Sequence, residues 1–156
     1  YTDLLDERLL VTPSVALQSC NKVAVQMADL SIRSFKDSLS LFDKFDAKLA
    51  DKIRENEAKV DLYEDMLGSY LVKLSAHCTN EKDSVELTKL LHMIGDFERI
   101  SDHAVDILES AEEMREKGIV FSSSATASLV AGAPCSTNVL SISKIIPRYP
   151  LSYNPV

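Results

Sequence analysis

The sequence predicts an all-α fold: an elongated antiparallel three-helix bundle followed by an irregular C-terminal tail. Three observations support this prediction. Between residues 13 and 118, apolar residues recur at steps of three and four, as on helices that bury one face. The only proline of this stretch is at its first position. Two short polar turns divide it into segments of about thirty residues, each on the order of 45 Å long as a helix, and short turns require antiparallel neighbours.

The first helix is expected to run from Pro13 to Phe42, after a charged lead over residues 1–12. Thr12 offers an N-cap hydroxyl, and proline is favoured at the first helical position. A turn is expected around residues 43–46. The apolar stripe that predicts this helix contains Ala16, Cys20, Val23, Met27 and Leu30.

The second helix is expected to extend to about Cys78, and the third to end at Lys117-Gly118. A basic last turn with glycine just beyond it is a typical helix end. Asn80 and Asp83 are candidate caps for the start of the third helix. The second stripe contains Leu49, Ile53, Val60, Leu67, Leu71 and Leu74. The third contains Leu87, Leu91, Ile94, Val105, Leu108 and Ala111.

Residues 119–156 form a separate tail by composition, after a bundle over residues 13–118. All 24 acidic residues lie at or before Glu116, whereas residues 122–156 contain eight serines, four prolines and two charged residues. Proline and the missing helical period predict irregular structure. A fourth helix packed on the bundle would contradict this expectation.

The charge and the cysteines narrow the class of protein. The net charge of −7 excludes binding to nucleic acid and adsorption to anionic lipid as expected functions. No run approaches the roughly 18–20 apolar residues that a membrane helix needs, so no direct membrane insertion is expected. Three widely spaced cysteines predict neither a disulfide framework nor a zinc-thiolate site, and reduced thiols indicate the cytoplasm. Because the chain begins at Tyr1, we expect it to be part of a longer protein.

Two acidic pairs, Glu57-x-x-x-Asp61 and Glu98-x-x-x-Asp102, lie on consecutive predicted helices. Residues four apart share one helical face. Glu57 lies as many residues before the turn at Thr79-Asn80 as Asp102 lies after it, and the same holds for Asp61 and Glu98. A hairpin at this turn therefore places four carboxylates at one level. Both glutamates are also in phase with the apolar stripes, so we expect them to point towards a neighbouring helix.

Like charges in such a group require compensation, which predicts a metal ion, an internal cation or protonation. A solvated acidic face without a metal is the alternative. Arg33 and Arg99 are candidate internal cations, and Arg33 is expected at the level of Glu57. Asp29 is a candidate fifth ligand. Asp65 and Asp106 continue the two acidic rows as outer candidates.

An all-oxygen site is suited to hard ions, namely Mg²⁺, Mn²⁺, Ca²⁺ or ferric iron, and less to Zn²⁺. The Glu-x-x-His spacing of ferritin-type di-iron sites is absent from the sequence. His103 is expected to be a surface residue or an accessory ligand. Catalytic nucleophile motifs and phosphate-binding glycine loops are also absent, so the sequence does not predict an enzyme.

The segment from Glu98 to Ala104, ERISDHA, resembles the signature of the PhoU family, and Glu57-x-x-x-Asp61 resembles the first motif of a PhoU repeat. This family regulates phosphate uptake, and its three-helix repeats hold metal clusters on acidic motifs. The resemblance implies that Glu57, Asp61, Glu98 and Asp102 are metal ligands. Two departures are Asp106, where Asn is usual, and Ser101, where Gly is common.

A narrower resemblance covers about residues 4–122. The segments LDERLL with Thr12-Pro13, Tyr70-Leu71, Gly118-Ile119 and Phe121-Ser122 resemble the cytoplasmic PhoU-like region of bacterial Na⁺/phosphate cotransporters. This implies a non-enzymatic regulatory domain tethered at the inner face of the membrane, with the transporter's membrane domain as partner and a homodimer as a further expectation. The family's second helical repeat is missing, which predicts a frame-shifted or unrelated tail. The alternatives are a helical protein-interaction module without metal and, less favoured, a metal-dependent phosphate-handling enzyme.

Overall fold

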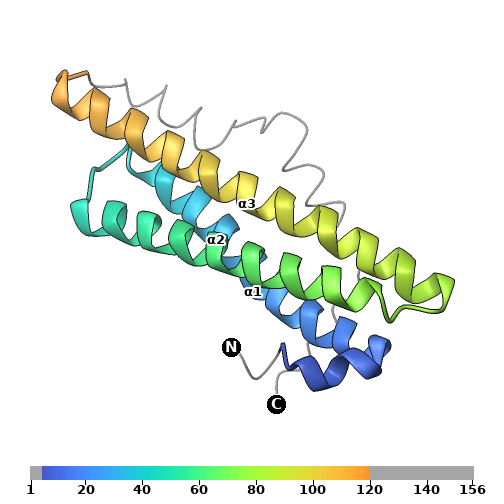
Figure 1. Ribbon diagram of the computed structural model, residues 1–156. Helices are drawn as coiled ribbons and strands as arrows, with labels where there is room; N and C mark the ends of the chain where they lie inside the picture. The colour runs from blue at the N-terminus through green and yellow to red at the C-terminus, as the bar shows by residue number, and fades with distance from the viewer. Residues whose placement is uncertain (1–4, 120–156) are drawn as a thin grey trace, which may run out of the picture. The chain divides into compact units, whose positions relative to one another are not determined.

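The computed structural model describes residues 5–119, which form one short 3-10 helix and three long α-helices (Figure 1). These are η1 (Glu7–Val11), α1 (Pro13–Ser40), α2 (Ala47–Ser75) and α3 (Glu81–Glu116). The predicted all-α class and the three-helix bundle are confirmed. The expected irregular tail and its shifted reading frame concern residues outside the described part.

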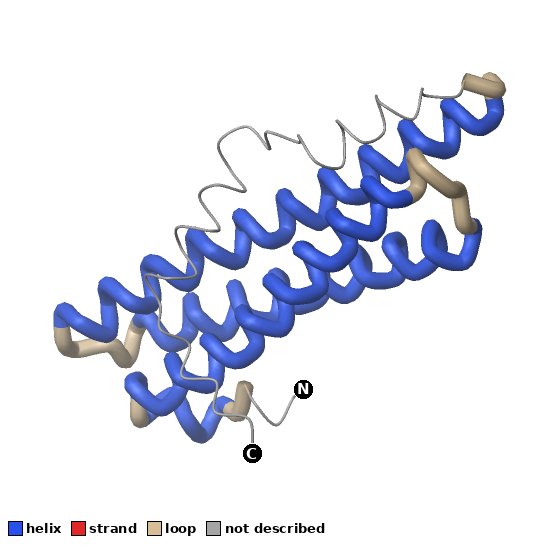
Figure 2. Tube along the Cα trace, turned by 180° about the vertical axis from the view of Figure 1, so that it is seen from behind, coloured by secondary structure: helices blue, strands red, loops and turns tan. Residues whose placement is uncertain are grey.

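The three long helices form an up-down-up bundle in which each helix packs against both others. Consecutive helices are antiparallel because the turns between them, residues 41–46 and 76–80, are short. The α1 and α3 helices consequently run parallel. Figures 1 and 2 show the three helices side by side from opposite directions. The acidic segments of α2 and α3 therefore belong to adjacent antiparallel helices.

The core of the bundle contains the predicted apolar stripes. Its largest fully buried apolar side chains include Leu17, Met27, Ile53, Leu67, Leu71, Leu74, Leu90 and Leu108. Four predicted stripe residues are only half-buried: Leu30, Leu49, Leu91 and Val105. The neighbouring Ser31 and Leu90 are buried instead of Leu30 and Leu91. Each helix is apolar on one stripe only, and no helix within residues 5–119 combines the length and apolarity needed to cross a membrane.

The helix ends follow most of the predicted signals, with one correction. Pro13 begins α1, but the Thr12 side chain makes no capping hydrogen bond. The Asn80 side chain caps α3 by accepting a hydrogen bond from the Asp83 backbone N–H, at 2.8 Å. At the other end of α3, Gly118 has a φ of +64°, which favours glycine and allows the chain to leave the helix at the predicted position.

The first two helices end slightly earlier than predicted, at Ser40 rather than Phe42 and at Ser75 rather than Cys78. Beyond Ser40 the backbone N–H groups of Leu41 and Phe42 bond to carbonyls three residues back, so the last turn tightens before the chain reverses.

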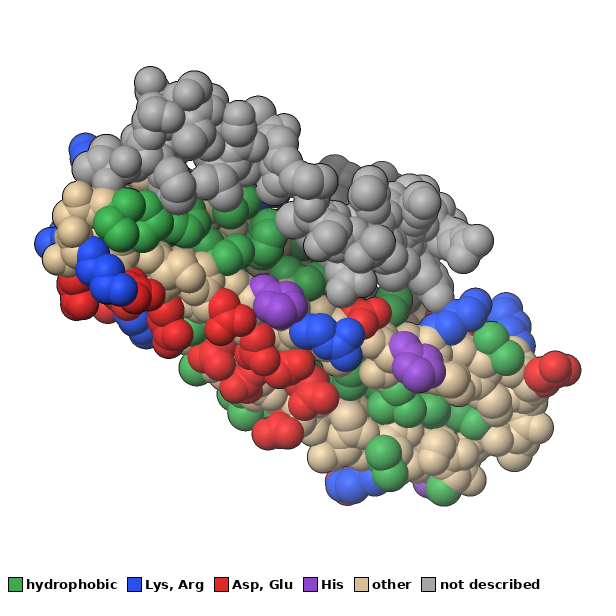
Figure 3. All heavy atoms as spheres, turned by 90° about the horizontal axis from the view of Figure 1, so that it is seen from above, with side chains coloured by type: hydrophobic (Ala, Val, Ile, Leu, Met, Phe, Trp, Pro, Cys, Tyr) green, Lys and Arg blue, Asp and Glu red, His purple; other side chains and the backbone are tan. Residues whose placement is uncertain are grey.

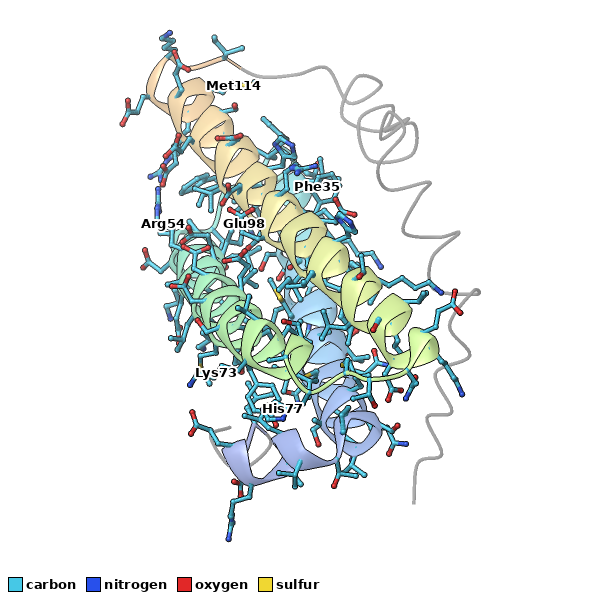
Figure 4. All side chains as sticks on the ribbon, turned by 45° about the vertical axis from the view of Figure 1, so that its right-hand side comes forward. Phe35, Arg54, Lys73, His77, Glu98 and Met114 are labelled. Atoms are coloured by element: carbon cyan, nitrogen blue, oxygen red, sulfur yellow. The ribbon has the colours of Figure 1, made fainter. Side chains whose placement is uncertain are left out.

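The charged lead contains a helix that the sequence did not predict. The Asp6 carboxylate caps η1 by accepting from the Arg8 N–H at 2.8 Å. The Tyr70 hydroxyl of α2 donates to the Asp6 carbonyl at 2.8 Å, and Lys73 forms an ion pair with Glu7 at 2.5 Å. Figure 4 shows Lys73 near the end of α2 that adjoins η1. Contacts to α2 thus hold η1 in place.

Candidate functional site

The structure brings Glu57 and Asp61 of α2 together with Asp102 of α3. Each of the three residues offers a carboxylate oxygen, and these oxygens all lie within 4.8 Å of one another. The hairpin at residues 76–80 produces this juxtaposition because it places the two acidic segments opposite each other on antiparallel helices. No other group of three or more acidic, histidine or cysteine ligands occurs within the described range 5–119.

Glu98 adjoins this group rather than forming its centre. When it is protonated, its side chain can donate a hydrogen bond to Asp102, and its pKa is raised by burial and also by the charges of Asp61 and Glu64. Figure 4 shows Glu98 on the part of α3 that passes α2. All four predicted acids therefore interact in one cluster, which we call the acidic cluster: Glu57, Asp61, Glu98 and Asp102.

The glutamates of the acidic cluster are more buried than its aspartates. Glu57 and Glu98 are half-buried, whereas Asp61 and Asp102 are exposed. The expected position of the glutamates in the apolar stripes needs a correction, because the buried positions belong to the preceding residues. Asn56 is 5% exposed and Phe97 is 8% exposed. The glutamates consequently lie at the edge of the core.

The half-buried acids have raised pKa values. Burial is the largest cause for Glu57, followed by the charges of Asp61 and Asp102. Burial also raises the pKa of Glu98 most, followed by the hydrogen bond with Asp102 and the charges of Asp102 and Asp61. The charged form of both glutamates is therefore disfavoured, and either a cation or protons would stabilise the cluster.

Within residues 5–119, no lysine, arginine or histidine forms an ion pair with a member of the acidic cluster. Arg33, a candidate cation at the level of Glu57, is exposed and forms no ion pair with Glu57 among the described residues. Arg99 instead lies 3.6 Å from Asp96, one turn earlier on its own helix. Asp29 is also exposed and is not a member of the three-residue group.

The outer candidates, Asp65 and Asp106, do not belong to the group of three carboxylates. Asp65 is exposed, and an Asp106 oxygen lies 3.5 Å from His103 Nδ1. His103 is therefore a surface residue paired within α3. Glu64, which the sequence analysis did not select, acts on Glu98; its position three residues after Asp61 was the available signal. Figure 3 shows acidic side chains gathered on one face of the bundle.

The donor chemistry of the acidic cluster fits a hard cation. The three oxygens come from carboxylates, which are the preferred ligands of Mg²⁺, Mn²⁺ and Ca²⁺. No histidine or cysteine belongs to the group, which makes it a poorer match for Zn²⁺. Two exposed aspartates beside two half-buried glutamates would leave coordination positions open to water or to a further ligand.

The PhoU domain family matches residues 24–111, more than half of the chain. The chain belongs to the PhoU domain family. The match contains the whole acidic cluster and relates this PhoU domain to the regulation of phosphate homeostasis. Domains of this family are regulatory rather than enzymatic. A comparison with curated proteins found no match, and a comparison with solved structures found none either.

Proposed function

We propose that this PhoU domain is a non-enzymatic regulator of phosphate transport that binds a hard metal ion through Glu57, Asp61 and Asp102. Glu98 takes part either as a fourth ligand or, when protonated, by donating a hydrogen bond to Asp102. The observation that carries the proposal is the approach of three carboxylate oxygens from two helices to within 4.8 Å, inside the matched domain.

Metal binding would act on the bundle through its charge. A divalent cation offsets the repulsion among the carboxylates and joins α2 to α3 at this level. With the cation bound, the carboxylates of the acidic cluster hold α2 and α3 at a fixed distance. Without the cation, these carboxylates move apart or bind protons. A partner protein that contacts this surface can respond to the change in charge and helix spacing.

The partner that we propose is the membrane domain of a Na⁺/phosphate cotransporter-like protein, on the same or a separate chain. The domain would then be cytoplasmic and tethered at the inner face of the cell membrane. The resemblance of residues 4–122 to such cytoplasmic regions supports this partner. A homodimer is a further proposal for the assembled state.

Calorimetric titration of Mn²⁺ into the metal-free domain tests the site. The wild-type chain should bind Mn²⁺ with a measurable Kd. The double variant Glu57→Gln with Asp102→Asn should bind at least about tenfold more weakly, because removing even the groups that orient ligands typically costs about 10–100-fold in affinity. Equal heats of binding for both proteins would refute the metal site and favour a helical interaction module.

Phosphate uptake by cells that carry the same double substitution tests regulation. We expect the rate of uptake to differ from that of wild-type cells at equal protein abundance. If the variant no longer binds metal but its rate of phosphate uptake is unchanged, the metal site does not regulate phosphate transport. Residues Glu55 and Lys59 offer a control, since they form an exposed ion pair on α2 outside the acidic cluster.

A further inference from the structure

In the C-terminal third of α1, the fully buried positions hold small polar side chains, although Phe35 packs against the core. Three serines take the core positions there: Ser31, Ser34 and Ser38, each 0% exposed. The hydroxyls of Ser31 and Ser38 donate to carbonyls of their own helix. Ser34 differs, because its Oγ accepts a hydrogen bond from Asn56 Nδ2 of α2, at 3.1 Å.

This buried hydrogen bond lies at the level of the acidic cluster. Asn56 directly precedes Glu57, and Ser101 directly precedes Asp102. Because Glu57 and Asp102 lie opposite each other, Asn56 and Ser101 are within about 3 Å of each other along the helix axes. Ser101 is also 0% exposed, and its Oγ has no hydrogen-bond partner in the described part of the chain.

Polar groups at this depth cost stability relative to apolar side chains of the same shape. A buried asparagine in a helical bundle is known to select one alignment of the helices at the expense of stability. The side chain of Asn56 can satisfy its hydrogen bond to Ser34 only over a narrow range of α2 rotation. It therefore restricts the direction in which the next residue, Glu57, points.

A small rotation of α2 moves its carboxylates by more than metal–ligand distances tolerate. With a helix radius of about 5–6 Å including side chains, a rotation of about 20° moves a surface carboxylate by about 2 Å. Metal–ligand distances tolerate only about 0.2 Å. Free rotation of α2 would thus separate Glu57 and Asp61 from Asp102.

We infer that Asn56 is a positioning residue, whose hydrogen bond to Ser34 fixes the rotation of α2 so that Glu57 and Asp61 meet Asp102. This inference rests on the proposed metal site. The bond couples α1, which contributes no acid to the three-residue group, to the geometry of a site built by α2 and α3.

The test uses the double variant Asn56→Leu with Ser34→Ala, which removes both polar partners together. Removing both leaves neither partner of this bond buried and unpaired, so the metal-free thermal midpoint should stay equal to or above that of the wild type. The Kd for Mn²⁺, measured by calorimetry, should rise at least tenfold, as for residues that orient ligands. Ser31→Ala is the matched control, because this buried serine bonds only within α1, and its Kd should not change.

The outcomes are distinguishable. Failure of the wild-type chain to bind Mn²⁺ would overturn the proposed metal site itself. Binding by the wild type together with an unchanged Kd in the folded double variant would overturn only the role of Asn56. Should the double variant fail to give the helical circular dichroism spectrum, Ser34→Ala alone replaces it, and an unchanged Kd in that variant would equally overturn the role of Asn56.

Discussion

Replacing Glu57 by glutamine should stabilise the metal-free PhoU domain. Glutamine has nearly the same shape and helix propensity as glutamate, so the main change is the loss of one negative charge. That charge lies half-buried beside Asp61 and Asp102, with oxygens of the three residues within 4.8 Å of one another. Its pKa is raised by burial and by these two neighbours, which shows that the ionised form is disfavoured in the native state.

The expected gain follows from Coulomb repulsion. At a separation of 4.8 Å, two unit charges repel by about 0.9 kcal/mol in water. Glu57 has two such neighbours, and a Debye length of about 10 Å at 0.1 M salt reduces each repulsion to about 60%. The substitution should therefore raise the free energy of unfolding by about 1 kcal/mol, or the thermal midpoint by about 4 °C for a domain of this size.

Thermal unfolding with a chelator present, at pH 7 and about 0.1 M salt, measures this gain. Glu55→Gln is the matched control: Glu55 lies two residues away on α2 and forms an ion pair with Lys59 at 2.7 Å, so its neutralisation should give no gain. The gain of the Glu57 variant should shrink in 1 M salt, where the Debye length is about 3 Å. A Glu57 variant no more stable than the wild type, or an equal gain in the control, would refute the reasoning.

Three further predictions concern proton binding, the buried hydroxyl and η1. Because the pKa values of Glu57 and Glu98 lie above the ordinary 4.5, the native state binds more protons than the unfolded state above that pH, so their contribution to stability falls as pH rises towards neutrality. Metal-free wild type should accordingly lose more stability between pH 5 and 7 than a variant with glutamine at both positions, and equal losses would contradict this. Ser101→Ala should raise stability by about 1 kcal/mol in denaturant unfolding, because it removes an unpaired buried hydroxyl; a loss would show that the hydroxyl has a partner. Tyr70→Phe should cost about 1 kcal/mol and speed amide hydrogen exchange in η1, since the hydroxyl holds the Asp6 carbonyl; unchanged exchange would show that η1 is held otherwise.

Much of the bundle could be predicted because its signals are local. Pro13 starts α1 because its ring fixes φ near the helical value, and Gly118 follows the end of α3 because glycine tolerates the positive φ found there. The η1 helix could not be predicted, since five residues are too few to show a period. Its position depends on Tyr70 and Lys73, which lie more than sixty residues away in the sequence.

The acidic cluster was predictable in part, through the symmetry of its positions about the turn. The burial of Asn56 was not. From Ile53, a step of three leads to Asn56 and a step of four leads to Glu57, and both continue to Val60 at allowed helical spacings. Both candidates are polar, so hydropathy does not distinguish them. Asn56 rather than Glu57 is buried because its side chain donates a hydrogen bond to Ser34 of α1.

Anomalous diffraction from a crystal of this domain soaked in Mn²⁺ tests the central claim most directly, namely that α2 and α3 together form one cation site. We expect one peak within about 2.0–2.6 Å of carboxylate oxygens from Glu57, Asp61 and Asp102. Absence of a peak there in a fully soaked crystal, or peaks bound to only one of the two helices, would contradict the account.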